Sequence, residues 1–416
     1  MRTRSARIVT LGVLLATAII GSGCATPAVP AHPAVSPPRP VSGPRPDARP
    51  LPGQPGSLLS ATFVSPSQGW LLVSIRCGPA SCLHLEHTTD AGRRWMAVTS
   101  PELGRPAWSG RIFAIQFADS RDGWAYGSGP LLATHDGGRT WQAAALPGHG
   151  RPGAGVQALG VLDGTVEVLV AEGRNPSDEG PSRLYASDVS RDSWHPVPAV
   201  GADGARGSFA AADGVGYAAF PEESATATGT TATGLALYRS RDGRTWARLP
   251  GPPCPGTPAA ATSTVLYLVC VDGAAAGSTG KLVYRSADGG RTWQRVAHAP
   301  FGGDLDGVAA SPDTLLVSWG GGDAGIYVSL DGGEHWATAY TGHIPDAIAD
   351  MVMTTATRGY AIDSGSVLLT TRDAGRHWAA VRAPGGREPS GAAVRRGSRG
   401  HTRISPARSS PPPPPA

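Results

Sequence analysis

The sequence predicts an all-β fold, namely a seven-bladed β-propeller of four-stranded antiparallel blades. Seven short turns rich in Asp and Gly recur along the chain, each closed by a Trp, and successive Trp residues stand 42 to 53 residues apart. The segments between them are short apolar runs bounded by turn residues, without sustained helical periodicity. A repeat of that length holds about four short strands, which is one propeller blade.

The turn is clearest at residues 286–293, Ser-Ala-Asp-Gly-Gly-Arg-Thr-Trp. An apolar run at 281–284 precedes it and a polar–apolar alternation at 294–296 follows, so we expect strand, tight turn and strand. The Gly pair supplies positive φ, and the Ser and Asp oxygens can accept hydrogen bonds from the backbone of the turn. The Trp offers apolar area that holds the hairpin against a neighbour.

Close copies of this turn lie at 134–141 and 329–336, and two more, at 88–95 and 371–378, have Ala for the first Gly. The copy at 240–246 is one residue shorter, and the copy at 187–194 has lost its Gly. We expect each Asp to serve its own hairpin and each Trp to serve packing. Calcium binding by the Asp side chains is the alternative, but too few oxygen ligands are clustered to favour it. The seven pairs are Asp90 and Trp95, Asp136 and Trp141, Asp188 and Trp194, Asp242 and Trp246, Asp288 and Trp293, Asp331 and Trp336, and Asp373 and Trp378.

The turn resembles the Asp-box (bacterial neuraminidase) repeat, S/T-x-D-x-G-x-T-W. A second signal, Gly followed by an aromatic residue, precedes some of the turns, and residues 117–136 look like one repeat of the photosystem II stability/assembly factor-like propellers. The resemblance covers residues 57–384 and implies an architecture, with the boxes on the face away from the ligand site. It says little about activity, because sialidases, sorting receptors, glycanases and assembly factors share the repeat. The Gly–aromatic pairs are Gly69-Trp70, Gly123-Trp124, Gly216-Tyr217 and Gly359-Tyr360.

Residues 1–24 have the pattern of an export signal: three Arg residues, an apolar run at 8–20, and small residues before Cys24. The run is short for a membrane span. Gly21-Ser22-Gly23-Cys24 resembles a bacterial lipobox, with Gly21 in place of the usual Leu. We expect a lipoprotein held by acyl chains on Cys24 at the outer face of the cytoplasmic membrane. The alternative is plain secretion, in which Cys24 is incidental.

Residues 25–56 and 385–416 are rich in Pro and Arg, with Ala in the first and Ser in the second, so we expect a disordered linker and a disordered tail. Residues 1–56 and the tail each carry six Arg against one acidic residue. The whole chain is +4, which leaves the propeller at about −6. The excess of basic residues therefore lies in the two terminal segments and is no evidence that the propeller binds nucleic acid. The tail either binds a cell-wall polymer or is solvated, and its composition favours solvation.

Seven blades fit between the ends, each read as inner strand, second strand, third strand, turn and outer strand. We place them at about 57–101, 110–147, 153–200, 204–253, 257–300, 303–342 and 344–384.

Four cysteines fall within the propeller. In an exported chain an even number predicts disulfides, and strand geometry pairs Cys77 with Cys82 and Cys254 with Cys270. A metal site with His84 and His87 is the alternative. The positions of those two histidines differ by an odd number, so their side chains should face opposite sides of a strand. The spacing of the cysteines and histidines matches no standard zinc pattern. We therefore expect no metal and no cofactor.

If the turns occupy one face, the loops between second and third strands and between blades occupy the other. That face carries the insertions at 172–182, 221–234 and 274–280 and the Cys77–Cys82 segment, and long loops on a rigid scaffold are the usual place for binding. The alternative is that the insertions are solvated, and that Trp108 and Phe301 fill seams between blades. The candidate binding residues are Trp108, Arg105, Phe301, Asp304, Asp306, Tyr340, His343, Glu172 and Arg174.

We expect a monomeric, non-catalytic binding or assembly module that recognises a protein, a peptide or an envelope glycan. The alternative is a carbohydrate-active enzyme of the exo-sialidase kind. A sialidase-like site needs three Arg residues around a substrate carboxylate, but the expected inner strands offer only Arg111, at the start of one. Ordinary glycoside hydrolysis needs two opposed carboxylates, for which Asp304, Asp306 and Asp350 are the nearest candidates.

Overall fold

The computed structural model describes most of the chain between residues 56 and 383. The described ranges are 56–108, 111–147, 154–172, 181–203, 207–226, 229–272, 280–299, 304–320, 325–341, 348–363, 367–381 and 383. The expected signal segment with Cys24, the linker and the tail lie outside these ranges.

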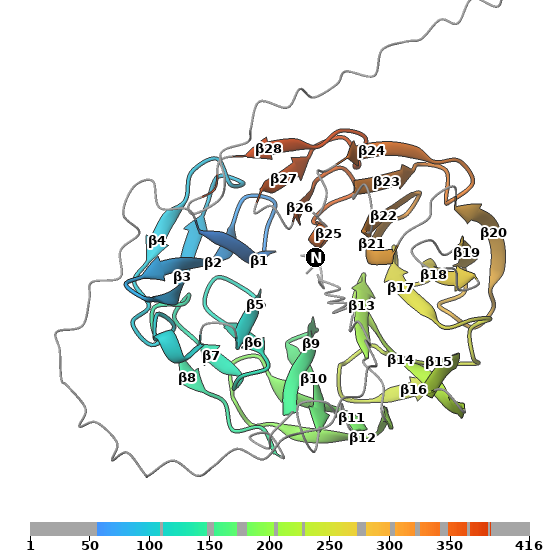
Figure 1. Cartoon of the computed structure of the whole chain (residues 1–416). Helices are drawn as coiled ribbons and strands as arrows, with labels where there is room; N and C mark the ends of the chain where they lie inside the picture. Colours follow the sequence, from blue (N-terminus) through green and yellow to red (C-terminus); the bar gives the residue numbers. More distant parts are fainter. Residues whose placement is uncertain are drawn as a thin grey trace, which may run out of the picture.

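The strands form seven four-stranded antiparallel sheets that stand as blades around one axis (Figure 1). Blades 1 and 2 hold β1 Ser57–Phe63, β2 Gly69–Cys77, β3 Ala80–Thr88, β4 Met96–Val98, β5 Ile112–Phe117, β6 Gly123–Gly127, β7 Leu132–Thr134 and β8 Gln142–Ala143. Blades 3 and 4 hold β9 Ala154–Leu162, β10 Thr165–Glu172, β11 Pro181–Asp188, β12 His195–Asp203, β13 Ser208–Ala212, β14 Val215–Thr226, β15 Gly229–Ser240 and β16 Trp246–Arg248. Blades 5 and 6 hold β17 Gly256–Ala260, β18 Leu266–Asp272, β19 Gly280–Ser286, β20 Gln294–Ala299, β21 Asp304–Ser311, β22 Thr314–Gly320, β23 Gly325–Ser329 and β24 Ala337–Thr341. Blade 7 holds β25 Ile348–Met353, β26 Gly359–Asp363, β27 Leu368–Thr371 and β28 Ala379–Val381.

The predicted fold class is confirmed, including the reading of each blade as four consecutive strands. One short 3-10 helix, η1 at Pro106–Trp108, links blades 1 and 2. Among the residues described, no helix has the length and apolar character needed to cross a membrane.

The ring closes between blades 7 and 1 without a shared sheet, because all four strands of each come from one stretch of chain. The Tyr360 hydroxyl donates to the Ala61 carbonyl at 2.7 Å, and the Ala61 N–H donates to Asp350 Oδ2 at 3.3 Å. Apolar side chains from both blades, Val73 and Ile362 among them, form one buried cluster beneath these bonds. Side-chain packing and a few polar contacts therefore close the ring, and no strand of one blade joins the sheet of the other.

The inner strands have one backbone edge free of strand pairing, and polar side chains of the preceding blade satisfy part of it. Ser60 Oγ accepts from the Ile115 N–H at 3.3 Å, and Thr62 Oγ1 accepts from the Phe117 N–H at 3.4 Å. A buried backbone N–H without a partner is costly. These buried hydroxyls therefore stabilise the seam between blades 1 and 2.

An aromatic residue near the start of the second strand reaches from its blade into the next. Trp70 stacks on Phe117 with ring centroids 4.0 Å apart, and its Nε1 donates to the Gly137 carbonyl at 3.2 Å. The Tyr217 and Tyr267 hydroxyls likewise donate to backbone carbonyls in blades 5 and 6. The Gly–aromatic signal of the sequence thus marks a contact between blades.

One expectation about the loops is wrong. The segment Pro221–Gly234, expected as a Ser/Thr/Ala/Gly loop, continues β14 and β15 as a paired hairpin down to Thr226 opposite Gly229. Its composition concealed this, because Thr favours strands while Gly, Ser and Ala read as loop.

Candidate interaction face

Topology divides the propeller into two faces. The turns between third and fourth strands and the links between first and second strands share one face, which we call the turn face. Backbone bonds join the two sets, as where Gly137 N donates to the Arg121 carbonyl at 2.8 Å and Gly289 N to the Thr264 carbonyl at 2.8 Å. The opposite face holds the links between second and third strands and between blades, and we call it the loop face.

On the turn face, the polar groups of each regular turn are used within the turn. The Asp288 carboxylate accepts from the Arg291 and Thr292 N–H groups at 3.0 and 2.9 Å and from the Thr292 hydroxyl at 2.6 Å. Ser286, which is buried, donates to Asp288 Oδ1 at 2.8 Å and accepts from the Gly290 N–H at 2.9 Å. The Thr292 hydroxyl bond, followed by the backbone bonds, lowers the pKa of Asp288. These carboxylates are ionised parts of the hairpin.

Two turns replace the Thr by His without losing the bond. His335 Nδ1 lies 2.7 Å from Asp331 Oδ2, and His377 Nδ1 lies 2.6 Å from Asp373 Oδ2. The backbone bond from His335 and that residue's side-chain bond hold the pKa of Asp331 at about 2. An imidazole N–H therefore takes the role of the hydroxyl.

The turn of blade 3 departs from this pattern. Its carboxylate, Asp188, pairs with Arg244 of the blade 4 turn and lies 3.7 Å from Arg191. Ser187 Oγ instead accepts from the Ser193 N–H at 3.0 Å. The expectation that every turn Asp serves its own hairpin is thus wrong here, because the missing Gly and the longer spacing leave Asp188 free to join two blades.

The seam between blades 2 and 3 is joined on the turn face by a histidine bridge. His135 Nδ1 lies 2.6 Å from Asp122 Oδ1, and its Nε2 lies 3.2 Å from Asp192 Oδ2. Burial lowers the pKa of His135, but the two carboxylates outweigh it and raise that pKa overall. Burial also raises the pKa of Asp122, against the opposing effect of the histidine.

The seam between blades 3 and 4 holds a buried acid that sequence reasoning missed. Val166 of β10 pairs with Ser187, and Gly216 of β14 pairs with Ser240 in the same way. The next residue along each strand therefore holds the same position in its blade, which is Glu167 in blade 3 and Tyr217 in blade 4. Glu167 is 1 % exposed, its Oε1 has no hydrogen-bond partner among the described atoms, and a Cβ on Gly243 would overlap that oxygen. Burial raises the pKa of Glu167 well above its usual range. Blade 6 has Leu316 at this position, so the one signal in the sequence was an acid where the other blades have an aromatic residue or Leu.

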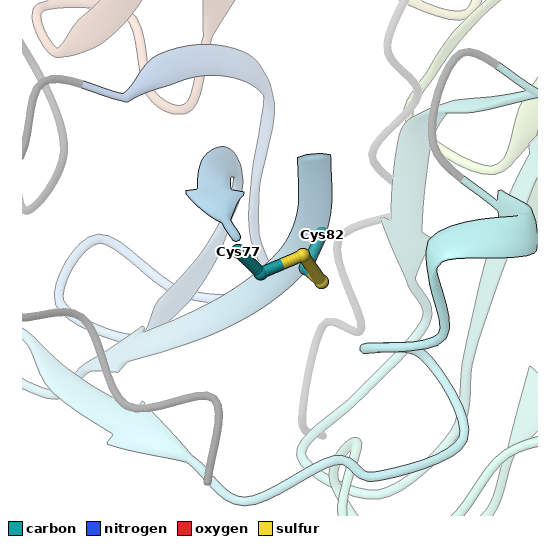
Figure 2. The surroundings of a disulfide bond; sticks show 2 residues. All are labelled: Cys77 and Cys82. Carbon is teal, nitrogen blue, oxygen red and sulfur yellow. A yellow bond between two sulfur atoms is a disulfide. The ribbon is translucent and has the colours of Figure 1, made fainter. Parts of the chain in front are cut away.

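On the loop face, both predicted disulfides are confirmed. Cys77 and Cys82 join the ends of β2 and β3, with a Cα–Cα distance of 5.8 Å (Figure 2). Both lie in strands rather than in the expected loop, since Cys77 pairs with Ala80. Cys254 and Cys270, 6.1 Å apart at Cα, fasten the link from blade 4 to the second strand of blade 5. Two of the segments on this face are therefore braced covalently.

The alternative metal assignment for blade 1 has no support in this geometry, since both cysteines are oxidised. His87 packs on Trp70 with ring centroids 4.7 Å apart, and His84 Nε2 is buried. Within the described ranges, one group of potential metal ligands gathers on the turn face, at Asp331, Glu334 and His335. All three are exposed, and Asp331 and His335 already bond each other.

Three of the predicted binding residues can be placed, and they do not converge. Arg105 is exposed, whereas Trp108 is half-buried against the blade 1–2 core and donates from Nε1 to the Glu102 carbonyl at 3.0 Å. The Tyr340 hydroxyl donates to Asp363 Oδ2 at 3.0 Å in the seam between blades 6 and 7. Trp108 thus takes the seam-filling role weighed as its alternative. Glu172, Asp304 and Asp306 lie in strands whose side chains here fall outside the description, and Phe301, His343 and Arg174 lie outside the described ranges.

The buried acids of blade 7 do not form a catalytic pair. Burial raises the pKa of Asp350 to about 7, which suits a general acid, and its Oδ1 has no described partner. Its Oδ2, however, is turned toward blade 1 at Ala61, while Asp363 is turned toward blade 6 at Tyr340. The two carboxyls thus belong to opposite seams, whereas glycosidases place two carboxyls across one substrate.

Comparison with known proteins supports the fold alone. No protein-family model matches the chain, and no curated protein matches it. Among solved structures, YCF48 from Cyanidioschyzon merolae has 16% identity and a TM-score of 0.50, covering 78% of this chain and 97% of that one. The β-propeller domain of the Trilobed protease from Pyrococcus furiosus, described as having an open velcro topology, has 8% identity and a TM-score of 0.50, covering 82% and 99%. A structure of YCF48 bound to D1 peptide has 16% identity and a TM-score of 0.48, covering 78% and 95%. At these identities the chain is a seven-bladed β-propeller whose function has to be argued from its own surface.

Proposed function

We propose that this chain is a non-catalytic propeller of the cell envelope that binds a protein or peptide through its loop face. The observation that carries the proposal is the contrast between the two faces. On the turn face, the carboxylates, hydroxyls and backbone N–H groups of the regular turns bond each other, as at Asp288. On the loop face, two disulfides brace segments at the strand ends, and one hairpin extends past its sheet. Rigid scaffolds with projecting segments are suited to recognition, since little ordering entropy is lost on binding.

The N-terminal pattern and the disulfides support the proposed location of the protein. Two disulfides fit an oxidising compartment. Acylation at Cys24 would hold the propeller at the outer face of the membrane on the linker of residues 25–56. Replacing Cys24 by Ser should release the chain into the medium and abolish labelling by an alkyne fatty acid. Continued labelling of the variant would refute the assignment.

A display experiment tests the binding function. A random peptide library is selected against the chain lacking residues 1–24, and a glycan array and a fluorogenic glycoside panel are run beside it. We expect peptides that bind saturably and no glycoside turnover. Selective glycan binding without peptide binding would contradict the proposal, and turnover abolished by Asp350→Asn would favour the enzyme alternative.

A further inference from the structure

Two positions of the turns meet across seams on the turn face. One is the residue that follows the buried Ser or Thr of a turn, and the other stands two residues before the Trp of the next blade's turn. His135 and Asp192 hold these positions between blades 2 and 3, where His135 Nε2 lies 3.2 Å from Asp192 Oδ2. Asp188 and Arg244 hold them between blades 3 and 4, and they form an ion pair. In both seams, the facing side chains are an acid and a base.

The seam between blades 4 and 5 has arginine at both of these positions. Arg241 follows Ser240, and Arg291 stands two residues before Trp293. Both arginine side chains are exposed, and Arg291 donates from Nη1 to the carbonyl of Asp288 at 2.8 Å. Two positive charges therefore face each other where the two preceding seams pair an acid with a base. Such an arrangement costs free energy unless an anion lies between the charges.

A third arginine joins this pair. Arg239, near the end of β15, is half-buried, and it donates from Nε to the Tyr217 hydroxyl at 3.4 Å and from Nη2 to the Ser263 carbonyl at 3.5 Å. Burial raises the pKa of Tyr217, while the bond from Arg239 and the positive charges of all three arginines oppose this. The three guanidinium groups thus act on one hydroxyl in the seam.

The carboxylates in this seam do not pair with the three arginines. Asp288 accepts from the N–H groups and the hydroxyl of its own turn, and Asp213 Oδ2 accepts from the Ser263 N–H at 3.3 Å. Within the part of the chain that the structure describes, no acid forms an ion pair with Arg239, Arg241 or Arg291. Donors on these guanidinium groups are therefore available to a ligand.

Neighbouring seams lack this combination. Between blades 5 and 6, Arg285 holds the position of Arg239, since it pairs with Tyr267 as Arg239 pairs with Tyr217. There the negative charges of Asp313 and Asp331 act on the Tyr267 hydroxyl together with Arg285. Three uncompensated arginines are thus particular to the seam between blades 4 and 5. Between blades 7 and 1, the three positions hold Arg372, Arg93 and Thr370.

We propose that the seam between blades 4 and 5 on the turn face binds a phosphate group through Arg239, Arg241 and Arg291. Guanidinium groups bind oxyanions through forked pairs of N–H donors. A phosphate group has the charge and the oxygen atoms to engage more than one guanidinium, whereas a carboxylate offers one charge and two oxygens. The site lies on the face opposite the proposed peptide-binding face, so it is independent of that function.

Thermal unfolding of the full chain tests this site, because a ligand that binds the folded state raises the Tm. Inorganic phosphate at about 50 mM should raise the Tm by about 2 °C or more above its value in sodium chloride of the same ionic strength. The double variant Arg241→Gln/Arg291→Gln should lose most of this difference, since each lost charge-assisted bond weakens binding by about tenfold or more.

Arg139→Gln is the matched control. Arg139 is exposed, stands two residues before Trp141, and donates from Nη1 to the Asp136 carbonyl at 2.6 Å, as Arg291 does in its own turn. The position that faces it in blade 1 is Thr89 rather than an arginine. This variant should therefore keep the full response of the parent to phosphate.

Three outcomes would overturn the proposal. These are a Tm in phosphate no higher than in chloride, the same phosphate response in the double variant as in the parent, or an equal loss of response in Arg139→Gln. A parallel titration with glycerophosphoglycerol, a soluble phosphodiester, identifies the source of the phosphate group. A larger response to it than to inorganic phosphate supports a lipid headgroup, and a smaller response supports free phosphate.

Discussion

Replacing Glu167 by Gln should remove a pH-dependent cost from folding. The folded state keeps this carboxyl protonated in the seam between blades 3 and 4, where burial raises its pKa well above the usual value of 4.5. In the unfolded chain it ionises near that value. A carboxyl whose pKa is raised in the folded state does not destabilise the fold below pH 4.5, where it is protonated in both states. The loss of folding free energy grows as the pH rises from there toward the folded pKa.

The magnitude follows from linkage. Each pH unit between the two pKa values costs about 1.4 kcal/mol of folding free energy. Between pH 5 and the folded pKa of Glu167, the parent protein should therefore lose stability with each pH unit relative to Glu167→Gln, which cannot ionise. The absolute stability of the variant also reflects the burial of its amide, so the pH slope carries the test.

Urea unfolding followed by Trp fluorescence at pH 5, 6, 7 and 8 measures this difference. The exposed Glu334, replaced by Gln, is the control and should follow the parent curve. A constant free-energy difference between parent and Glu167→Gln across this range would refute the buried protonated acid. A second variant tests the geometry, because Gly243→Ala should be strongly destabilising in the parent and less so beside Glu167→Ala, which removes the overlapping oxygen.

Three further outcomes are expected. Ser286→Ala should lower the free energy of unfolding in urea by about 2 kcal/mol, because a buried backbone N–H loses its acceptor. Ser286→Thr keeps the hydroxyl and should not have this effect, so equal losses in the two variants would contradict this role. Replacing Cys254 and Cys270 together by Ser should cost roughly 3 kcal/mol, the loop entropy of a 16-residue separation, and an unchanged Tm relative to the parent would contradict it. His135→Gln should lower the Tm at pH 5.5 but not at pH 8.5, because a raised folded pKa gives stability below the unfolded pKa that is lost as the pH rises. A pH-independent effect would show that the His135 bridge does not depend on charge.

The fold could be predicted from the sequence because the turn chemistry is local. A Ser or Thr, an Asp, a Gly and a Trp within eight residues satisfy their own hydrogen bonds, so the motif reads the same in every blade and counts the blades. The disulfides could be predicted because strand pairing places the ends of adjacent strands together. Where the motif weakened, at Asp188, prediction of the residue's partner failed as well.

The candidate site could be predicted only in part. Placing the insertions on the loop face needed strand order alone. The partner of Tyr340 and the role of Trp108 needed the neighbouring blade, because Asp363 and the blade 1–2 core are supplied by other segments of the chain. The hairpin of blade 4 was misjudged because strand pairing, rather than composition, decides whether a Thr- and Gly-rich segment is a strand.

Local patterns in the sequence are enough to predict a seven-bladed propeller, the face that its turns occupy and the pairing of its cysteines. Each of these follows from interactions within a few residues or between adjacent strands. The packing of the blades was needed to show that Glu167 lies buried under the turn of blade 4, that the ring closes through Tyr360 and Asp350, and that β14 and β15 continue beyond the strands beside them. Those features depend on which blade packs against which and where a neighbouring strand stops, and no local pattern records either.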